Sequence, residues 1–173
     1  MANIYEIKRR IRAVKNTRQI TRAMQLVAAS KMKRAQSRAL ISRPYVVLLA
    51  EMISTLHQKH LTLNLDHPLF EAREPGGVPG LLVVGSDRGL CGGLNSNLFR
   101  QIRQTHPNTQ FVAIGRKVAQ FLQKTGRSLL ASLSVSDQVE LSELRPAVGT
   151  LLEAFYAHKI DSVSILYPQF VNT

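Results

Sequence analysis

The stretch best suited to chemistry is "GSDRGLCGGLNSN", residues 85–97. It follows an apolar run typical of a buried strand, and it leads into an amphipathic helix. At such a junction the free backbone N–H groups of a helix N-terminus often bind phosphate. The stretch also contains Cys91, the single cysteine of the chain. A thiol at a helix N-terminus can have a lowered pKa and act as a nucleophile.

Neither chemistry matches a complete motif. The stretch lacks the Gly-Lys-Ser/Thr of a P-loop, and its glycines do not have the G-x-G-x-x-G spacing of dinucleotide sites. Asn97 stands where a phosphatase-like cysteine loop carries an arginine, and no general base for Cys91 is identifiable. Asp87 and Arg88 fit a salt-bridged turn as well as a ligand contact. We therefore favour a structural loop whose glycines make tight turns and contact a partner.

The remaining metal-ligating residue types do not form a site pattern. The five histidines are scattered, and His57 and His60, which share a helix face, have no carboxylate that would complete a metal set. We expect both to be exposed to solvent. A single cysteine excludes an internal disulfide and a multi-cysteine metal site. The sequence therefore predicts no metal and no cofactor.

Positive charge is concentrated at the start of the chain. The formal net charge is +12, from 23 Lys/Arg and 11 Asp/Glu. Residues 1–43 hold 12 of these basic residues and one acid, Glu6, whereas residues 44–173 hold 11 basic and 10 acidic residues. Pairs of opposite charge along one helix cannot neutralise so lopsided a segment. The segment predicts an acidic partner: nucleic acid, an anionic membrane or an acidic protein surface.

The same segment reads as one long helix. No glycine occurs between Asn3 and Leu56, and Pro44 is the only proline there. Apolar residues at helical spacing run from Ile4 to Ala39, and the many Ala and Met residues among them favour close approach by another helix. We expect the helix to bend at Pro44 and to protrude from a globular domain. The predicted divisions are a helix at 1–62, a linker at 63–80 with three prolines and three glycines, and a domain at 81–173.

The last division alternates strands and helices. Strands are expected at 81–86, 110–115, 128–135 and 162–168, and helices at 94–105, 116–126 and 139–159. Pro146 is tolerated in the last helix if that helix begins near Glu143. This alternation predicts a parallel sheet with right-handed crossovers. The predicted fold class is α/β: a long N-terminal coiled-coil-type helix plus a small parallel-sheet, Rossmann-like domain.

Composition and the N-terminus favour a soluble folded protein in a reducing, cytoplasmic-type compartment. No apolar run approaches the roughly 18–20 residues of a membrane span. The start "MANIYEIKRR" lacks the apolar core of a secretory signal.

Several segments carry a resemblance to a known family. They are "EIKRRIRAVKNTRQITRAMQLVAASKMKRAQ" (6–36), "RPY" (43–45), "DRGLCGGLNSNLF" (87–99), "AIGRK" (113–117) and "QFVNT" (169–173). In this order they resemble the gamma subunit, the central rotor shaft, of F-type rotary ATP synthases. The first and third segments are the most specific, and together the five cover both halves of the chain.

The resemblance implies a non-catalytic stalk subunit that couples ion-driven rotation to ATP synthesis or hydrolysis. Its N-terminal helix would pair with a C-terminal helix inside the ring of alpha and beta subunits, and its α/β domain would lie near the epsilon subunit and the membrane c-ring. The complex would be peripheral to the membrane, on the cytoplasmic face of the bacterial inner membrane or its organellar equivalent. The positive shaft would face an acidic lever segment of the catalytic subunits. The implied contact residues are Arg9, Arg12, Lys15, Arg18, Arg22, Met24, Lys31, Lys33, Arg34, Arg88 and Cys91.

Members of that family continue well beyond Thr173, into the helix that pairs with the N-terminal one. We therefore expect an N-terminal portion: a fragment, a degraded copy or an engineered truncation. The apolar seam of residues 4–40 would then be filled by a separate chain, would self-associate or would be partly disordered.

Two other functions stay open at this point. The first is nucleic-acid binding through residues 8–38, supported by charge alone, because only Tyr5 and Tyr45 flank the region and the chain has no Trp. The second is an α/β enzyme that uses Cys91 as its nucleophile.

Overall fold

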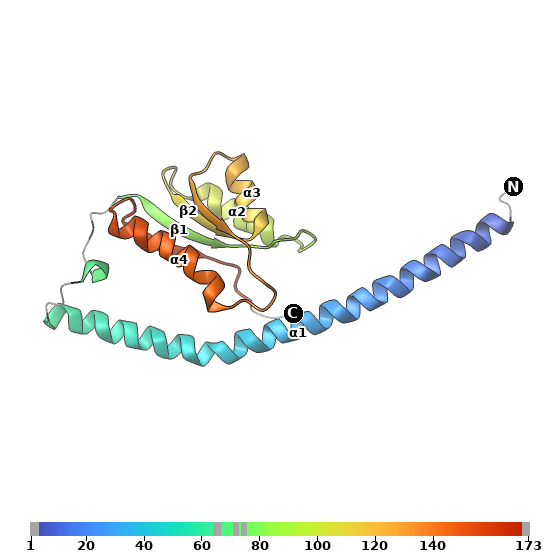
Figure 1. Ribbon diagram of the computed structural model, residues 1–173, viewed down its shortest axis with the longest axis horizontal. Helices are drawn as coiled ribbons and strands as arrows, with labels where there is room; N and C mark the ends of the chain where they lie inside the picture. Colours follow the sequence, from blue (N-terminus) through green and yellow to red (C-terminus); the bar gives the residue numbers. More distant parts are fainter. Residues whose placement is uncertain (1–3, 64–66, 71–72, 74–75, 171–173) are drawn as a thin grey trace. The chain divides into compact units, whose positions relative to one another are not determined.

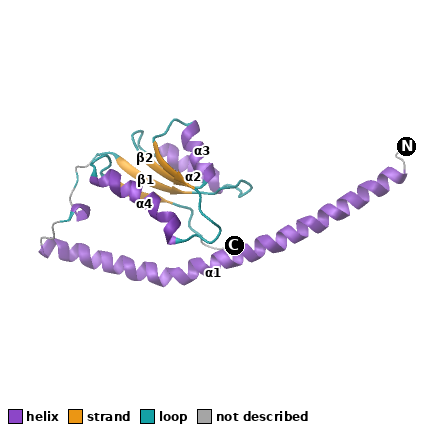
Figure 2. Cartoon of the chain, in the orientation of Figure 1, coloured by secondary structure: helices purple, strands orange, loops and turns teal. Residues whose placement is uncertain are grey.

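The computed structural model describes residues 4–63, 67–70, 73 and 76–170, with the side chains of 60–63 excepted. The chain forms two compact units, Met1–Leu65 and Asp66–Thr173, and each is described by itself. Figures 1 and 2 label and colour their elements. His60, expected to be exposed, lies outside the described side chains, whereas His57 is exposed.

The first unit is a single helix, α1 (Ile4–Leu63), of 60 residues. At 1.5 Å per residue it is about 90 Å long. It continues through Pro44, and Figure 1 shows it as one gently curved rod. Its described side chains are exposed, apart from the half-buried Gln36. Since a helix of this length needs tertiary packing for stability, its apolar stripe requires a partner.

The second unit contains a parallel sheet of four strands in the order β3-β2-β1-β4. This is the order in which a doubly wound sheet begins, so the α/β class and the Rossmann-like expectation are confirmed. A 3-10 helix, η1 (Pro68–Phe70), precedes the sheet. The strands are β1 (Pro79–Val84), β2 (Gln110–Ile114), β3 (Leu129–Leu133) and β4 (Ser162–Leu166). The helices are α2 (Leu94–Gln104), α3 (Arg116–Lys124) and α4 (Leu141–Tyr156).

Helices cover both faces of this sheet, with α2 and α3 on one face and α4 on the other (Figure 2). Successive side chains of a strand point to opposite faces. Leu81 and Val83 therefore pack with α2 and α3, while Leu82 packs with α4. A strand buried on both faces is a continuous apolar run, which is why "LLVV" was recognisable in the sequence.

The start of α4 differs from the expectation. The helix begins at Leu141, two residues before Glu143, so Pro146 lies beyond its first turn. The reason is a capping interaction: the Glu143 carboxylate accepts the backbone N–H of Glu140 at 2.9 Å and that of Ser136 at 3.2 Å. Chiefly the Glu140 hydrogen bond lowers the pKa of Glu143 below its ordinary value. Capping, and not proline, sets this boundary.

A membrane expectation also needs correction. By length and composition, the part of α1 from Ile4 to Lys59 could cross a membrane, because one 18-residue window has a mean hydropathy of 1.4. The expectation that no stretch approaches this length is wrong by this criterion. Arg43 and Glu51 interrupt the apolar run, but the aliphatic residues around them outweigh two charges in the mean. One such helix is weak support for a membrane span.

Candidate partner-binding site

The loop after β1 is held to the sheet by Asp87. The Asp87 carboxylate accepts the backbone N–H of Arg116, the first residue of α3, and the hydroxyl of Ser134 beyond β3, each at 2.9 Å. The Arg116 guanidinium lies 3.8 Å from the same oxygen. The backbone hydrogen bond from Arg116 is the main cause of a lowered Asp87 pKa. The turn is therefore salt-bridged, but through Arg116 and not through the adjacent Arg88.

A second group of hydrogen bonds closes the loop on itself. The Ser86 hydroxyl lies 2.6 Å from the carbonyl oxygen of Arg88 and donates to it. The Asn95 side chain, in the first turn of α2, donates to Ser86 Oγ at 2.8 Å and to Cys91 Sγ at 3.1 Å. These hydrogen bonds join the two ends of the loop and so restrict its conformational freedom.

Close backbone approach explains one of the nearby glycines. Gly115, which precedes α3, has φ of 105°, and a Cβ there would lie 2.5 Å from the carbonyl oxygen of Gly85. No side chain fits at that distance. The backbone N–H of Gly85 bonds to Ile114, and that of Gly115 bonds to Leu133. Backbone hydrogen bonds at the carboxyl ends of β1, β2 and β3 therefore support the base of the loop.

The loop does not have the geometry of a thiol active site. The contacts described for Cys91 Sγ are the Asn95 amide and, at 3.9 Å, the Ser86 hydroxyl. Neither group is a general base. Within the described part of the chain, no group of three or more His, Cys, Asp or Glu could hold a metal ion. The arrangement favours the structural interpretation of the loop over the enzymatic one.

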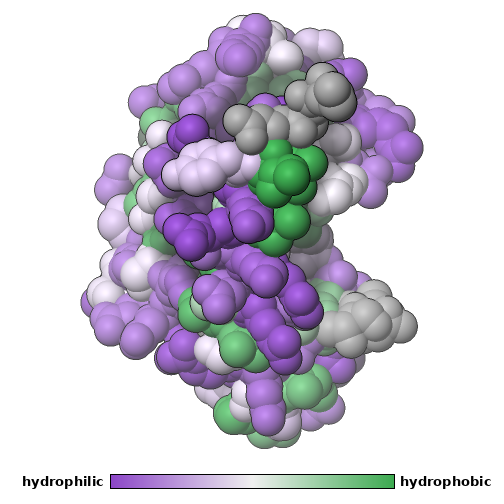
Figure 3. All heavy atoms as spheres, turned by 90° about the vertical axis from the view of Figure 1, so that its right-hand side faces the viewer, coloured by the Kyte–Doolittle hydropathy of each residue, from purple (hydrophilic) through white to green (hydrophobic). Residues whose placement is uncertain are grey.

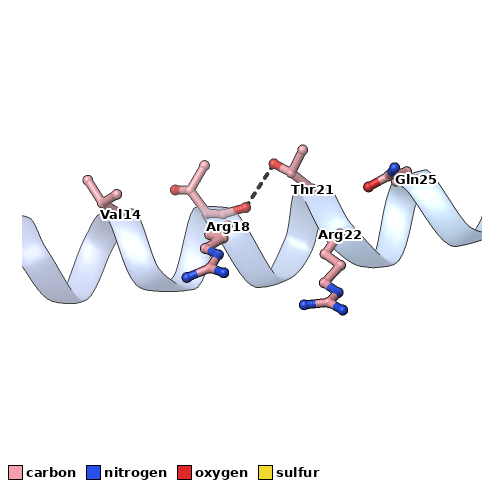
Figure 4. A pocket seen from close by; sticks show the side chains of 6 residues that line it. Val14, Arg18, Thr21, Arg22 and Gln25 are labelled. Carbon is pink, nitrogen blue, oxygen red and sulfur yellow. Dashed lines mark hydrogen bonds between the residues drawn. The ribbon is translucent and has the colours of Figure 1, made fainter.

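On α1, the exposed side chains of Arg18 and Arg22 form a basic face. Figure 4 shows Arg18 and Arg22 projecting to one side of the helix, while Val14 and Thr21 lie on the other. The Thr21 hydroxyl bonds to the carbonyl of Thr17 at 2.9 Å. Arg10 pairs with Glu6 at 2.7 Å, and α1 holds only one other acid, Glu51, against 13 Lys/Arg. The helix cannot neutralise its own charge.

The apolar stripe of α1 is uncovered. Ile7 is 47% exposed, Ile11 50% and Met32 52%, and each would be buried in a paired helix. On the face shown in Figure 3, hydrophilic residues predominate and hydrophobic ones form small separate groups. Uncovered apolar side chains at this spacing indicate a surface that binds another helix.

The predicted contact residues fall on two separate units. Arg9, Arg12, Lys15, Arg18, Arg22, Met24, Lys31, Lys33 and Arg34 lie on α1, and their side chains are exposed. Arg34 donates to the carbonyl and hydroxyl of Ser30 at 3.4 Å. Arg88 and Cys91 lie in the loop after β1, where Arg88 is exposed and Cys91 is half-buried. That these residues contact a partner stays a prediction.

Comparison with known proteins decides the family. The sequence profile described as ATP synthase matches residues 3–173. The ATP synthase gamma chain of Opitutus terrae is 43% identical over 173 residues, which is 100% of this chain. That of Akkermansia muciniphila is 43% identical over 174 aligned positions, and that of Methylacidiphilum infernorum is 44% identical over 178.

The chain belongs to the ATP synthase gamma-chain family. It spans 58%, 59% and 60% of the length of these three relatives, which is consistent with an N-terminal portion of such a chain. A gamma chain is a non-catalytic subunit of the synthase, so membership of the gamma-chain family supports the prediction that this chain is not itself an enzyme.

Three residues of the site were not predicted. Ser134 and Arg116 hold Asp87 from 47 and 29 residues away along the chain, and such pairings carry no local signal. Leu90, which the sequence analysis did not single out, is fully exposed and has a positive φ of 62°. A leucine among four glycines was the one signal available for it.

Proposed function

We propose that this chain acts as the N-terminal part of a central-stalk gamma subunit of a rotary F-type ATP synthase. It would perform no bond chemistry. It would couple ion-driven rotation of the membrane c-ring to ATP synthesis or hydrolysis on the catalytic subunits. The observation that carries the proposal is a 60-residue helix, basic and with an uncovered apolar stripe, in a chain of the gamma family.

The apolar stripe supports a paired shaft. A lone helix of this length gains too little from propensity to remain rigid, and a second helix packed on Ile7, Ile11 and Val14 would stiffen it. We propose that this second helix belongs to the portion of a gamma chain that follows residue 173. The alanines and methionines of residues 24–35 allow the close approach that such a pair needs.

The basic face supports contact with acidic segments of the ring. Arg18 and Arg22 stand one helical turn apart on the same side of α1 (Figure 4). Exposed charges of this kind guide and orient a partner more than they fix it, because water and salt screen them. A shaft that must turn against its partners needs contacts of this kind. We propose that the alpha and beta subunits are those partners, with the epsilon subunit and c-ring near the α/β unit and the complex peripheral to the membrane.

Reconstitution tests the proposal. The full chain would be mixed with the alpha–beta ring of the Opitutus terrae synthase, and the C-terminal part of that gamma chain would be supplied as a separate peptide. We expect a stable complex that co-elutes on size exclusion. Absence of binding with the peptide present would overturn the proposal.

The same preparation tests nucleic-acid binding. A net charge of +12 gives weak, strongly salt-dependent association with any DNA. We expect DNA affinity to fall steeply between 50 and 200 mM salt, by roughly a thousandfold or more, and to lack sequence preference. Submicromolar, sequence-selective binding at physiological salt would favour the nucleic-acid function instead.

A further inference from the structure

A buried arginine lies in the segment that precedes the sheet. The side chain of Arg73 is only 8% exposed, although the sequence predicts a linker at 63–80 and arginine is rarely buried without partners. Its Nη1 donates to the carbonyl oxygen of Ile160 at 3.3 Å and lies 3.8 Å from Asp161 Oδ1. Its guanidinium also lies over the Phe155 ring, with Cζ 3.9 Å from the ring centroid. One linker side chain therefore contacts both α4 and the residues just before β4.

Asp161 bonds to the linker at a second point. Its Oδ2 accepts the backbone N–H of Val78 at 2.7 Å, and its own backbone N–H donates to the Val78 carbonyl at 2.8 Å. A Cβ at Gly77 would overlap the Asp161 carboxylate, so glycine leaves the room that this carboxylate needs. We call Arg73, Gly77, Val78 and Asp161 the linker clamp.

Burial of apolar surface does not account for the arginine. Its neighbours Phe155 and Ile160 belong to the apolar core, and taking an ion pair out of water costs about as much as the pair returns. A methionine of similar volume would fill the same place at little cost. A methionine would lack direction, because charged hydrogen bonds fix both a distance and an angle between their partners. The ion pair therefore contributes more to the geometry of the linker than to the stability of the fold.

Arg73 also brings the fixed part of the linker closer to α1. The connection leaves α1 at Leu63, and Arg73 is held five residues earlier in the chain than Val78. Five residues correspond to at most about 18 Å of extended chain. A shorter free connection yields less when its two ends are pulled or twisted apart.

We propose that the linker clamp is a mechanical coupling point, at which Arg73 and Asp161 hold the linker so that α1 and the second unit turn together. This inference rests on the proposed function, because the linker carries a load only in a chain that transmits rotation. Arg73 and Asp161 are positioning residues in this role: they act by fixing the path of the chain.

The test separates coupling from stability. The Opitutus terrae synthase would be reconstituted in vesicles with this chain in place of the matching part of its gamma chain, and the C-terminal part would be supplied as a peptide. ATP hydrolysis and ATP-driven ion uptake would be measured on the same vesicles. A role in coupling changes the number of ions moved for each ATP hydrolysed, whereas a role in folding alone lowers both rates together.

Arg73→Met is the decisive variant. It removes the ion pair and keeps the packing on Phe155, while Asp161 stays 30% exposed and keeps the N–H of Val78. We expect the thermal midpoint of the chain to stay within about 3 °C of the unaltered one. Ion uptake per ATP should fall about threefold, as for the loss of one coupled pair. Arg145→Met, at an exposed position of α4, makes the same change in charge and should leave this ratio unchanged.

A double variant tests whether the two residues act as a pair. Adding Asp161→Asn to Arg73→Met should lower the ratio little further, because the interaction is already lost. Independent losses that add up in the double variant would contradict the pairing.

The outcomes separate the clamp from the stalk function. Ion uptake by the unaltered chain with the same ratio in Arg73→Met would overturn the clamp and keep the stalk function. Parallel losses of hydrolysis, uptake and thermal midpoint would show that the clamp only stabilises the fold, and would overturn it too. An unaltered chain that fails to assemble, or assembles without ion uptake, would overturn the stalk function and the clamp with it.

Discussion

The Asp87 carboxylate accepts the backbone N–H of Arg116 at 2.9 Å, across 29 residues of sequence. This hydrogen bond joins the glycine-rich loop after β1 to the first turn of α3. It also satisfies one of the N–H groups that a helix start leaves without an intrahelical partner. Asp87 therefore caps a helix that it does not precede in sequence, and it fixes the loop by the same contact.

Removing this cap should destabilise the second unit. We expect Asp87→Ala to lower the free energy of unfolding by about 1 kcal/mol at pH 7, the usual cost of a lost helix cap. Chemical denaturation would measure it. Glu153→Ala, at an exposed position of α4, is the control and should stay within about 0.5 kcal/mol of the unaltered chain.

The same contact predicts a pH dependence. The Asp87 pKa is lowered from 3.8 in the folded state, so the stabilisation is complete above 3.8 and is lost as the pH falls through the folded pKa. The stability difference between the unaltered chain and Asp87→Ala should therefore shrink below pH 3.8. A difference that stayed constant down to pH 2 would contradict this account.

Two glycines should respond to alanine in opposite ways. Gly115→Ala places a Cβ 2.5 Å from the Gly85 carbonyl oxygen at a φ of 105°. We expect this variant to lower the free energy of unfolding by at least about 2 kcal/mol, because backbone strain and overpacking add up. Gly149 lies inside α4 with open space around it, so Gly149→Ala should raise the free energy of unfolding by about 0.5–1 kcal/mol. Thermal unfolding of both variants tests the pair, and equal effects would contradict it.

Arg127 closes the end of α2. Its guanidinium donates to the carbonyls of Ile102, Thr105, His106 and Pro107 at 2.9–3.1 Å. Arg127→Ala leaves these acceptors without their charged donor, so we expect a loss of about 2 kcal/mol in unfolding free energy. Arg127→Lys should recover less than half of it, because lysine lacks the planar fork. Arg100→Ala, an exposed position on α2, is the control and should change little.

The basic face of α1 should act through charge. Reversal of Arg18 and Arg22 to Glu should weaken ring binding about tenfold at low salt, and the effect should diminish at high salt as screening increases. Reversal of Arg100 and Lys124, both exposed on the second unit, makes the same change in net charge and should have a smaller effect. Equal effects of the two double variants would show that net charge alone matters, and not its position on α1.

Much of the fold could be predicted because its signals are local. The absence of glycine and the helical spacing of apolar residues from Ile4 onward determine α1, and the run "LLVV" determines the central strand β1. Alternation of strand and helix then predicts a parallel sheet, since parallel neighbours need a crossover. The excess of basic residues in 1–43 is a property of composition, and so is the need for an acidic partner.

The tertiary structure decided which groups meet. Asp87 could have paired with the adjacent Arg88, but the parallel order β3-β2-β1 brings Arg116 and Ser134 to the same edge of the sheet instead. The contacts described for Cys91 Sγ are the side chains of Asn95 and Ser86, and neither of these can act as a general base for the thiol. Leu90 is fully exposed in a loop that hydrogen bonds fasten on both sides. Contacts between residues far apart in the chain depend on strand order and register, and no local run of residues encodes them.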